Sequence, residues 1–333
     1  MPALSVLDLI PVRSAQTSGQ AINASVELAR VADDAGYARY WVAEHHNMPA
    51  VASTHPATLI ALLASATERM RVGSGGVMLP NHAPLSVAEQ FAVLEARFPG
   101  RIDLGIGRAP GTDPLTSAAL RGSQFTPAEF PEHVAQVIEF LQPEGGLVEV
   151  AGRGARLRST PAGVSAPPVW LLGSSGYSAQ LAASMGLGYV FAHHFSGRGT
   201  GEALALYRSG FRGERPQAMI TANVCVAETT ERAEELALPF RHAMLWLATG
   251  APLRRQLTIE EATQAPVSDP ALFAAMSRPW FIGTPDAVRA GLEGLAHTHG
   301  VDEIMVQPVA GSSESDPIDR APNREDTLRL LAG

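Results

Sequence analysis

The chain has 333 residues, of which 46% are hydrophobic and 17% are charged. This composition supplies a large apolar core and excludes an intrinsically disordered chain. The formal net charge is −8 and the arginines are scattered along the sequence, so we expect no nucleic-acid partner.

The N-terminal stretch MPALSVLDLIPVRSA lacks the basic region and the long apolar run of a secretory signal. No window of the chain reaches the roughly 18 uninterrupted apolar residues that a membrane span needs. We therefore expect a cytoplasmic protein with no membrane partner. Cys225 is the only cysteine, which excludes an internal disulfide and a thiolate-rich metal site. Its surroundings, TANVCVAE, indicate a core strand rather than a nucleophile.

Short apolar strands alternate with amphipathic helices along the chain. We expect strands at LSVLDL, YWVA, RVGSGGVML, RIDLGIG, PVWLLG, GYVFAHH, AMITANVCVA and EIMVQPV. We expect helices near 19–36, 56–67, 84–96, 127–142, 177–185, 200–211, 285–296 and 319–331, and a charged helix from Thr229. Such alternation implies parallel strands joined by right-handed crossovers. The eight strands predict an α/β fold, a (β/α)8 TIM barrel, with residues 1–333 as one domain.

Three stretches depart from this alternation. The irregular stretches near 111–126 and 249–278 lie on the side where barrel loops build active sites. We expect them to be insertions at the C-terminal face that form a lid and line the substrate pocket. The sequence VEVAGRGARLRSTP predicts a hairpin with its turn at Gly152–Gly154, before the fifth strand.

Glu44, His45 and His46 follow the second expected strand. Residues just past the carboxyl end of a barrel strand point into the shared active-site mouth. A helix-borne metal pair needs histidines four residues apart, and no thiolate completes a zinc set, so a general base or hydrogen-bond donor fits better than a metal ligand. The alternative is that one histidine packs inward with a satisfied hydrogen bond while the other is solvated.

The third expected strand contains Gly73-Ser74-Gly75-Gly76. Glycine weakens a strand unless another group must approach the backbone closely. A planar ligand ring lying against this segment is the functional interpretation. A bulge or a tight bend of the barrel explains the same residues, and it is favoured from this segment alone.

The stretch GIGRAPG, residues 105–111, follows the fourth strand and at first sight matches a dinucleotide fingerprint. Its spacing is wrong, and Pro110 together with Asp113-Pro114 prevents the immediate helix that would face a pyrophosphate. We therefore interpret Arg108 as an anion-binding side chain at a strand end, with a structural ion pair as the alternative.

The segment Gly173-Ser174-Ser175-Gly176-Tyr177-Ser178 joins the fifth strand to a helix. Backbone N–H groups and serine hydroxyls at a helix N-terminus bind phosphate readily, so we interpret the segment as a phosphate site. Ordinary N-capping explains Ser178 but not the Gly-Ser-Ser-Gly composition.

His193 and His194 follow the sixth strand and face the same mouth. Together with His45 and His46 they could hold a metal, but the eighth strand, MVQPVAG, ends without a carboxylate. A metal-dependent hydrolase on the same barrel is therefore the second choice.

Taken in order, AEHHNM, VGSGGVMLPNHAPLSVAEQF, DLGIGRAPGTDP and LLGSSGYSAQLAASMGLGYVFAHHF resemble the bacterial luciferase-like flavin monooxygenases. The resemblance runs from Leu4 to about Gln307. It implies FMN as the cofactor, with the flavin ring resting against a non-proline cis peptide that corresponds to Gly75-Gly76.

The same resemblance implies a phosphate site at Ser174, with backbone donors from Gly176 and Tyr177. Arg108 corresponds to the arginine near the phosphate and the ribityl chain. The active-site histidine of the family corresponds to His45, with Glu44 beside it near the flavin as the second catalytic candidate.

By this resemblance, reduced FMN would react with oxygen and oxygenate a small organic substrate, while the protein supplies orientation and a dry pocket. His46 is interpreted as structural, and no metal is expected. No dinucleotide-binding segment is found, so we expect a separate NAD(P)H:flavin reductase to supply the reduced flavin. Family members often pair through helices beside the second and third strands, which predicts a homodimer.

Two other functions of the same fold stay open. Sister enzymes transfer hydride with a deazaflavin coenzyme, whose longer anionic tail would need more basic residues than Arg108; Arg198 and Arg212 are candidates. Some members of the superfamily are non-enzymatic flavin-binding proteins. The presence of His45 and of the long stretch 249–278 argues against this function, because a carrier needs neither.

Overall fold

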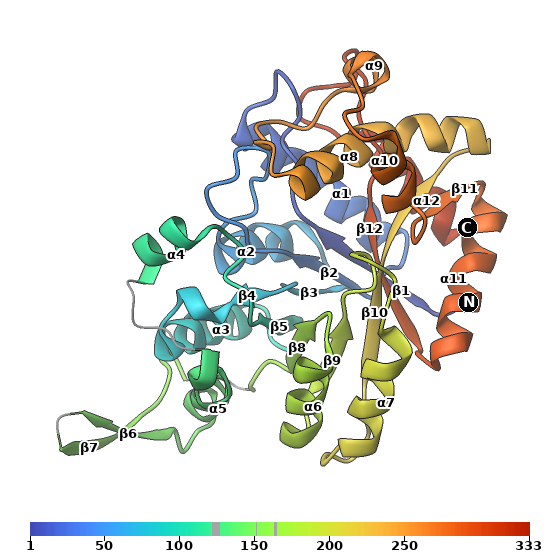
Figure 1. Cartoon of the computed structure of the whole chain (residues 1–333). Coiled ribbons are helices and arrows are strands. Elements are labelled where there is room, and N and C mark those ends of the chain that lie inside the picture. Colours follow the sequence, from blue (N-terminus) through green and yellow to red (C-terminus); the bar gives the residue numbers. More distant parts are fainter. Residues whose placement is uncertain (122–126, 151, 163–164) are drawn as a thin grey trace.

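The computed structural model describes residues 1–121, 127–150, 152–162 and 165–333, and its centre is a closed barrel of parallel strands (Figure 1). The barrel strands are β1 (Ala3–Asp8), β2 (Arg39–Val42), β3 (Arg71–Ser74), β5 (Ile102–Gly107), β8 (Val169–Gly173), β9 (Gly188–Phe191), β10 (Ala218–Val226) and β12 (Glu303–Pro308). Strand β10 pairs with both β9 and β12, and β12 pairs with β1, which closes the circle. The predicted (β/α)8 TIM barrel is confirmed.

Two short strands extend the barrel sheet. Strand β4 (Val77–Met78) follows β3 after an interruption and pairs with β5. Strand β11 (Phe281–Gly283) pairs with the end of the long strand β10. Both additions lie toward the carboxyl ends of the barrel strands, where the candidate site residues also lie.

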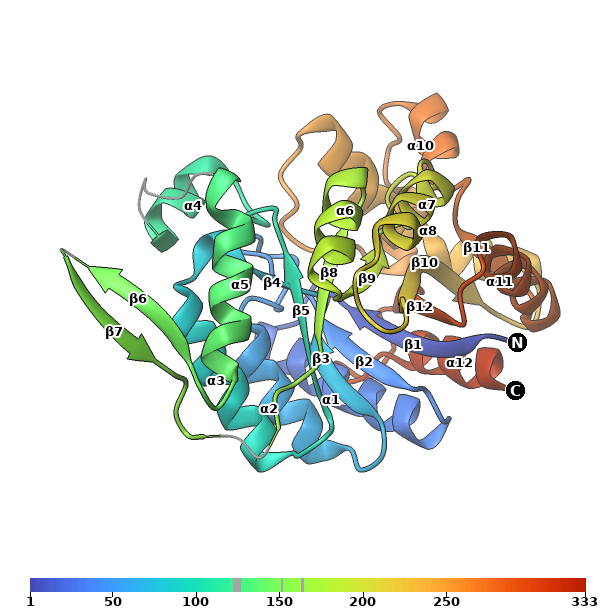
Figure 2. The ribbon, with the colours of Figure 1, turned by 90° about the horizontal axis from the view of Figure 1, so that it is seen from below.

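Helices surround the barrel, as the views in Figures 1 and 2 show. They are α1 (Ser18–Asp34), α2 (Pro56–Ala66), α3 (Pro84–Arg97), α5 (Phe130–Leu141), α6 (Gly176–Met185), α7 (Thr200–Gly210), α8 (Thr230–Thr249), α11 (Pro285–His299) and α12 (Pro322–Ala332). Single 3₁₀ turns precede α3 at η1 (Leu79–Asn81) and α5 at η2 (Pro127–Glu129). Each predicted helix is present. In the part of the chain that the structure describes, no helix combines the length and apolar character that crossing a membrane requires.

Three short helices at the barrel mouth were not predicted: α4 (Pro114–Arg121), α9 (Ile259–Gln264) and α10 (Pro270–Met276). Each begins at a capping residue whose side chain accepts a backbone hydrogen bond. These residues are Asp113, Thr258 and Asp269, and Thr258 forms a capping box with Glu261. Asp-Pro and Thr-x-x-Glu are readable helix-start signals, so the sequence did carry a local indication of all three helices.

The predicted hairpin is present as the antiparallel strands β6 (Gly146–Val150) and β7 (Arg153–Leu157). It projects away from the barrel in both ribbon views (Figures 1 and 2). Strand β7 already begins at Arg153, so the predicted turn at Gly152–Gly154 was placed too late.

The barrel interior is filled by apolar side chains from six of its strands. They are Leu7, Trp41, Trp170, Val190, Met219 and Met305, which form one buried cluster. Cys225 on β10 is fully buried in a second cluster, and burial raises the pKa of its thiol to about 12. The prediction that Cys225 is a core residue of a strand is confirmed.

Candidate functional site

All the candidate residues lie past the carboxyl ends of barrel strands, and therefore at one face of the barrel. Glu44 to His46 follow β2, Gly75-Gly76 separates β3 from β4, and Arg108 follows β5. The Ser174–Tyr177 segment joins β8 to α6, and His194 follows β9. Helices α8 and α10 pass over this face of the barrel (Figure 1).

Glu44 is fully buried at the centre of a hydrogen-bond cluster. Its Oε1 atom lies 2.8 Å from His46 Nε2, 2.8 Å from His82 Nε2 and 3.2 Å from Asn81 Nδ2. Its Oε2 atom accepts the backbone N–H of Met78 at 3.0 Å. Burial raises the pKa of the Glu44 carboxyl, but the hydrogen bonds from His82 and His46 outweigh burial and hold this pKa below its ordinary value. Glu44 is therefore an anion whose oxygens are already occupied by donors.

The same cluster is the one group among the described residues with a composition suited to a metal ion. The candidate ligand atoms of Glu44, His46 and His82 all lie within 4.8 Å of one another. His82 was not considered from the sequence, because it follows the third strand and meets the other two residues only in the folded chain. The two 2.8 Å contacts between nitrogen and oxygen are ordinary hydrogen-bond distances, so the arrangement is explained by hydrogen bonds alone.

His45 points away from this cluster and lines a cavity. Its Nδ1 atom lies 3.2 Å from the carbonyl oxygen of Gly111, in the loop that begins with Arg108. A carbonyl only accepts, so Nδ1 carries the proton and Nε2 is left as an acceptor. Burial lowers the pKa of His45, against the opposing effect of the Gly111 carbonyl. The imidazole is therefore neutral at neutral pH.

The two histidines after β9 have different surroundings. His194 lines the same cavity as His45, and its Nδ1 contacts Thr221 Oγ1. Burial lowers the pKa of His194 to about 3, with smaller effects from His193 and His45. His193 instead contacts Thr200 Oγ1 at 2.8 Å and packs against His299. Within the described ranges, the two histidine pairs do not form a joint metal cluster, and this weakens the hydrolase alternative.

The peptide between Gly75 and Gly76 is cis. A Cβ atom at Gly76 would lie 2.8 Å from the carbonyl oxygen of Gly105, and one at Gly75 would lie 2.6 Å from Leu7 Cδ1. The backbone of β5 therefore requires glycine at Gly76, whereas a side chain at Gly75 would require the end of the Leu7 side chain to move. The close approach of β5 explains Gly76 without a ligand, and the predicted contact with a flavin ring stays a prediction.

Arg108 and the start of α6 are brought together by the fold. The guanidinium of Arg108 lies 4.2 Å from the centre of the Tyr177 ring, and both side chains are exposed. The N-cap residue of α6 is Ser175, and its side chain makes no capping hydrogen bond. Arg108 forms no ion pair with a carboxylate in the described ranges, so the ion-pair alternative has no support there. A cation thus lies beside a helix start whose first N–H groups have no side-chain cap, which is the arrangement expected of an anion site.

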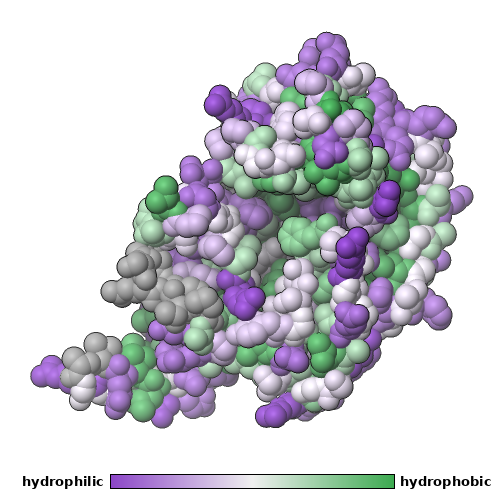
Figure 3. All heavy atoms as spheres, in the orientation of Figure 1, coloured by the Kyte–Doolittle hydropathy of each residue, from purple (hydrophilic) through white to green (hydrophobic). Residues whose placement is uncertain are grey.

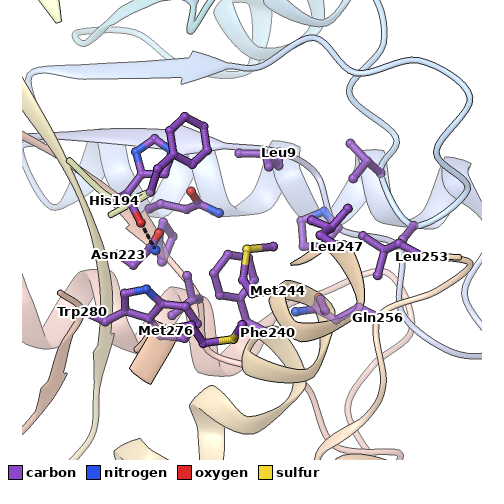
Figure 4. Close-up of a pocket in the computed structure, with 18 of the residues that line it drawn as sticks. Leu9, His194, Asn223, Phe240, Met244, Leu247, Leu253, Gln256, Met276 and Trp280 are labelled. Carbon is purple, nitrogen blue, oxygen red and sulfur yellow. Dashed lines mark hydrogen bonds between the residues drawn. The ribbon is translucent and has the colours of Figure 1, made fainter. Parts of the chain in front are cut away.

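A cavity of about 500 Å³ opens beside His45, between the barrel mouth and the helices above it. Helices α8 and α10 contribute seven of its apolar lining residues: Phe240, Ala243, Met244, Leu247, Ala248, Leu272 and Met276. Figure 3 shows the molecule hollowed below the region of α8 and α10, and Figure 4 shows the side chains that surround the cavity. Trp280 also lines it, together with the polar residues His194, Asn223, Gln256 and Gln307.

Of the two irregular stretches that were predicted to line the substrate pocket, one lines this cavity. Leu253, Gln256, Leu272 and Met276 come from the stretch 249–278, but residues 111–121 do not line the cavity. Residues 122–126 lie outside the described residues. The contribution of α8 was not predicted, because the sequence after Thr229 indicates only a charged helix.

The chain matches the family model described as luciferase-like monooxygenase over residues 3–303. The luciferase-like monooxygenase of Escherichia coli strain K12 is 41% identical over 314 positions, which cover 91% of this chain and 90% of the relative. The N-acetyl-S-alkylcysteine monooxygenase of Bacillus subtilis is 32% identical over 343 positions, which cover 100% and 98% of the two chains. The crystal structure of apo-MsnO8 matches with a TM-score of 0.88 at 34% identity, over 100% of this chain and 98% of the other. The chain therefore belongs to the luciferase-like monooxygenase family.

Proposed function

We propose that this chain is a monooxygenase that uses reduced FMN and oxygen to oxygenate a small organic substrate. One observation carries the proposal: the neutral imidazole of His45 lines an apolar cavity, and the loop that holds it begins at the exposed Arg108. A proton acceptor, an anion site and an apolar cavity are thus adjacent at the barrel mouth. These are the parts that an oxygenase with a phosphate-bearing cofactor needs.

The residues present suit the phosphate of FMN. Arg108 supplies a positive charge that no described carboxylate neutralises, and the start of α6 supplies N–H groups without a side-chain cap. We propose that Ser174, Gly176 and Tyr177 hold the phosphate with Arg108. Gly75-Gly76 would lie against the ring. Bound reduced FMN would supply the electrons that activate oxygen.

The roles of the two predicted catalytic residues differ in this proposal. His45 has a free Nε2 acceptor on the cavity side and can take up or hold a proton beside the substrate. Glu44 is buried and its oxygens already accept four hydrogen bonds, so we propose that it is a positioning residue. It accepts hydrogen bonds from His46 and His82, and in this way it fixes the backbone on both sides of His45.

A partner reductase is part of the proposal. The flavin-dependent trigonelline monooxygenase of Acinetobacter baylyi, described as an oxygenase component, is 26% identical over 309 positions. An oxygenase component acts together with a further protein component. We propose that this chain also acts with a second protein, an NAD(P)H:flavin reductase that supplies the reduced flavin.

The fold itself does not discriminate between FMN and the deazaflavin coenzyme. The oxygenating constituent of 3,6-diketocamphane monooxygenase in complex with FMN shares the fold at 19% identity and a TM-score of 0.75. An F420-dependent secondary alcohol dehydrogenase shares it at 13% identity and a TM-score of 0.67. Of the two extra arginines considered for a longer anionic tail, Arg212 lies next to Gly186 at the opposite end of α6 and cannot serve the barrel mouth. Arg198, exposed in the loop between β9 and α7, stays a candidate for that tail.

Anaerobic titration tests this proposal. The titration follows the tryptophan fluorescence of the purified chain. Reduced FMN should bind more tightly than oxidised FMN or the deazaflavin coenzyme. Binding of the deazaflavin alone would assign the chain to hydride transfer. Tight binding of reduced FMN without any substrate-dependent oxygen use would indicate a flavin carrier.

We also propose a homodimer that pairs through α2 and α3. Leu62 on α2 and Val93 on α3 have relative exposures of 47% and 53%, so these two helices present aliphatic side chains that a partner subunit could cover. Light scattering of the purified chain should give twice the chain mass, and Leu62→Glu with Val93→Glu should give the monomer mass. A monomer mass for the unmodified chain would contradict the proposal.

A further inference from the structure

The cavity beside His45 has a lining with no unpaired charge among the described residues. Its walls are mainly apolar and include Met244, Leu247, Met276 and Trp280 (Figure 4). The uncharged amides of Asn223 and Gln307 are neighbours on the paired strands β10 and β12 and are almost fully buried. No described aspartate or glutamate lines the cavity, so no carboxylate there pairs with a substrate cation.

Of the lining side chains that the structure describes, Arg324 is the one with a formal charge, and this charge is already neutralised. Its Nη2 atom lies 2.7 Å from Asp8 Oδ1, and its Nε atom donates to the carbonyl oxygen of Pro308 at 3.0 Å. Asp8 is fully buried and also accepts hydrogen bonds from Ser25 and Tyr40. The charge of the guanidinium is thus already balanced by a buried carboxylate, so a substrate carboxylate that approached its remaining Nη1 donors would meet an Arg–Asp pair rather than an uncompensated cation.

The two imidazoles of the lining are also uncharged at neutral pH. Burial lowers the pKa of both His45 and His194. His45 donates to the Gly111 carbonyl, and His194 is held by Thr221. Asn223 fixes the backbone of His194 as well, because its Nδ2 donates to the His194 carbonyl at 3.2 Å. The polar groups of the cavity can therefore exchange neutral hydrogen bonds but cannot compensate an ion.

We propose that the substrate of this site is an uncharged, mainly apolar molecule with one or two neutral hydrogen-bonding groups. The inference rests on the proposed oxygenase function and adds the chemical class of what is oxygenated. A cavity of about 500 Å³ is within the range of sites for small organic ligands. An ion moved from water into such a lining loses its hydration without gaining a partner, so carboxylates and ammonium ions are excluded.

Three probes with the same eight-carbon chain test the charge preference: octan-1-ol, octanoate and octylammonium. Their binding to the full chain without flavin is measured at pH 7.5 by calorimetry and by intrinsic tryptophan fluorescence, to which Trp280 in the lining contributes. Octan-1-ol is expected to bind at least about 100-fold more tightly than either ion. Each ion loses its hydration in the cavity and gains no oppositely charged partner, and this loss raises its dissociation constant by about 100-fold or more. Octanoate or octylammonium binding as tightly as octan-1-ol would overturn the proposal, and so would a cavity that binds none of the three.

A charge placed in the lining should reverse the preference. Met244→Lys puts an ammonium group among the lining residues, so octanoate should bind about 10-fold or more tightly than it does to the unmodified chain. Ser184→Lys adds the same charge at an exposed position on α6 outside the lining, and it should leave all three affinities unchanged. Equal effects of the two variants would show that octanoate responds to the net charge of the protein and would refute the assignment to this cavity.

The two proposals can fail separately. If octanoate binds as well as octan-1-ol while reduced FMN still binds, the substrate class is wrong and the oxygenase proposal is unaffected. If octan-1-ol binds selectively while reduced FMN does not bind, the cavity holds a neutral ligand but the oxygenase proposal fails.

Discussion

Replacing His45 by alanine is expected to lower the rate of substrate oxygenation by about 10²–10⁴-fold, the usual contribution of a positioned acid or base. The imidazole is held by the Gly111 carbonyl through Nδ1, and its Nε2 acceptor has no equivalent in alanine. The affinity for reduced FMN should change little, because the proposed phosphate contacts lie at Arg108 and α6. Product formation under steady turnover and anaerobic FMN titration measure the two quantities on the same preparation.

His297→Ala is the matched control, since His297 is exposed on α11 and outside the cavity. It should retain the rate of the unmodified chain. If His45→Ala turns over at the unmodified rate, His45 has no part in the chemistry. A loss of FMN affinity equal to the loss of rate would instead make His45 a cofactor-binding residue.

The protonation of the His45 imidazole is expected to make the rate of substrate oxygenation depend on pH. The pKa of His45 is lowered from its ordinary 6.5, so the neutral acceptor persists as the pH falls through 6.5 and is lost only at the lower, folded-state pKa. The acid limb of the rate should therefore lie below pH 6.5, and His45→Ala should lack it. An acid limb centred above pH 6.5 would assign the limb to another group.

Replacing Arg108 by alanine is expected to weaken FMN binding by about 10-fold to 100-fold, the loss of one or two charge-assisted hydrogen bonds. Riboflavin has the same ring and ribityl chain without the phosphate, so its affinity should change little. The unmodified chain should then prefer FMN over riboflavin, and Arg108→Ala should remove most of that preference. FMN and riboflavin are each titrated into the unmodified chain and into Arg108→Ala. The difference between the two proteins in their preference for FMN measures the interaction between Arg108 and the phosphate.

Arg212→Ala serves as the control, because Arg212 is exposed at the far end of α6 and carries the same charge. Equal losses for FMN and riboflavin on removing Arg108 would indicate that it contacts the ring or the ribityl chain. No loss for either flavin would move the phosphate site elsewhere on the barrel mouth.

Local periodicity was sufficient to predict the barrel. Each strand is a short apolar run and each long helix an amphipathic one, and these patterns depend only on neighbouring residues. The family resemblance likewise came from motifs that are continuous in sequence, from AEHHNM to GSSGYS. The short helices α4, α9 and α10 escaped because six to eight residues carry little periodicity, although their capping residues were visible.

The sequence by itself therefore determined the barrel, the family and the face on which the site lies, because strand ends in a parallel barrel share one edge. Only the tertiary structure decided which side chains meet there. It separated His193 from His194, joined Glu44 to His82, and brought Arg108 against Tyr177. It also placed the inner side of α8 over His45 to form the cavity. Such contacts join residues that are far apart in the chain. They depend on how the helices and loops that follow different strands pack together, and no pattern of neighbouring residues encodes that packing.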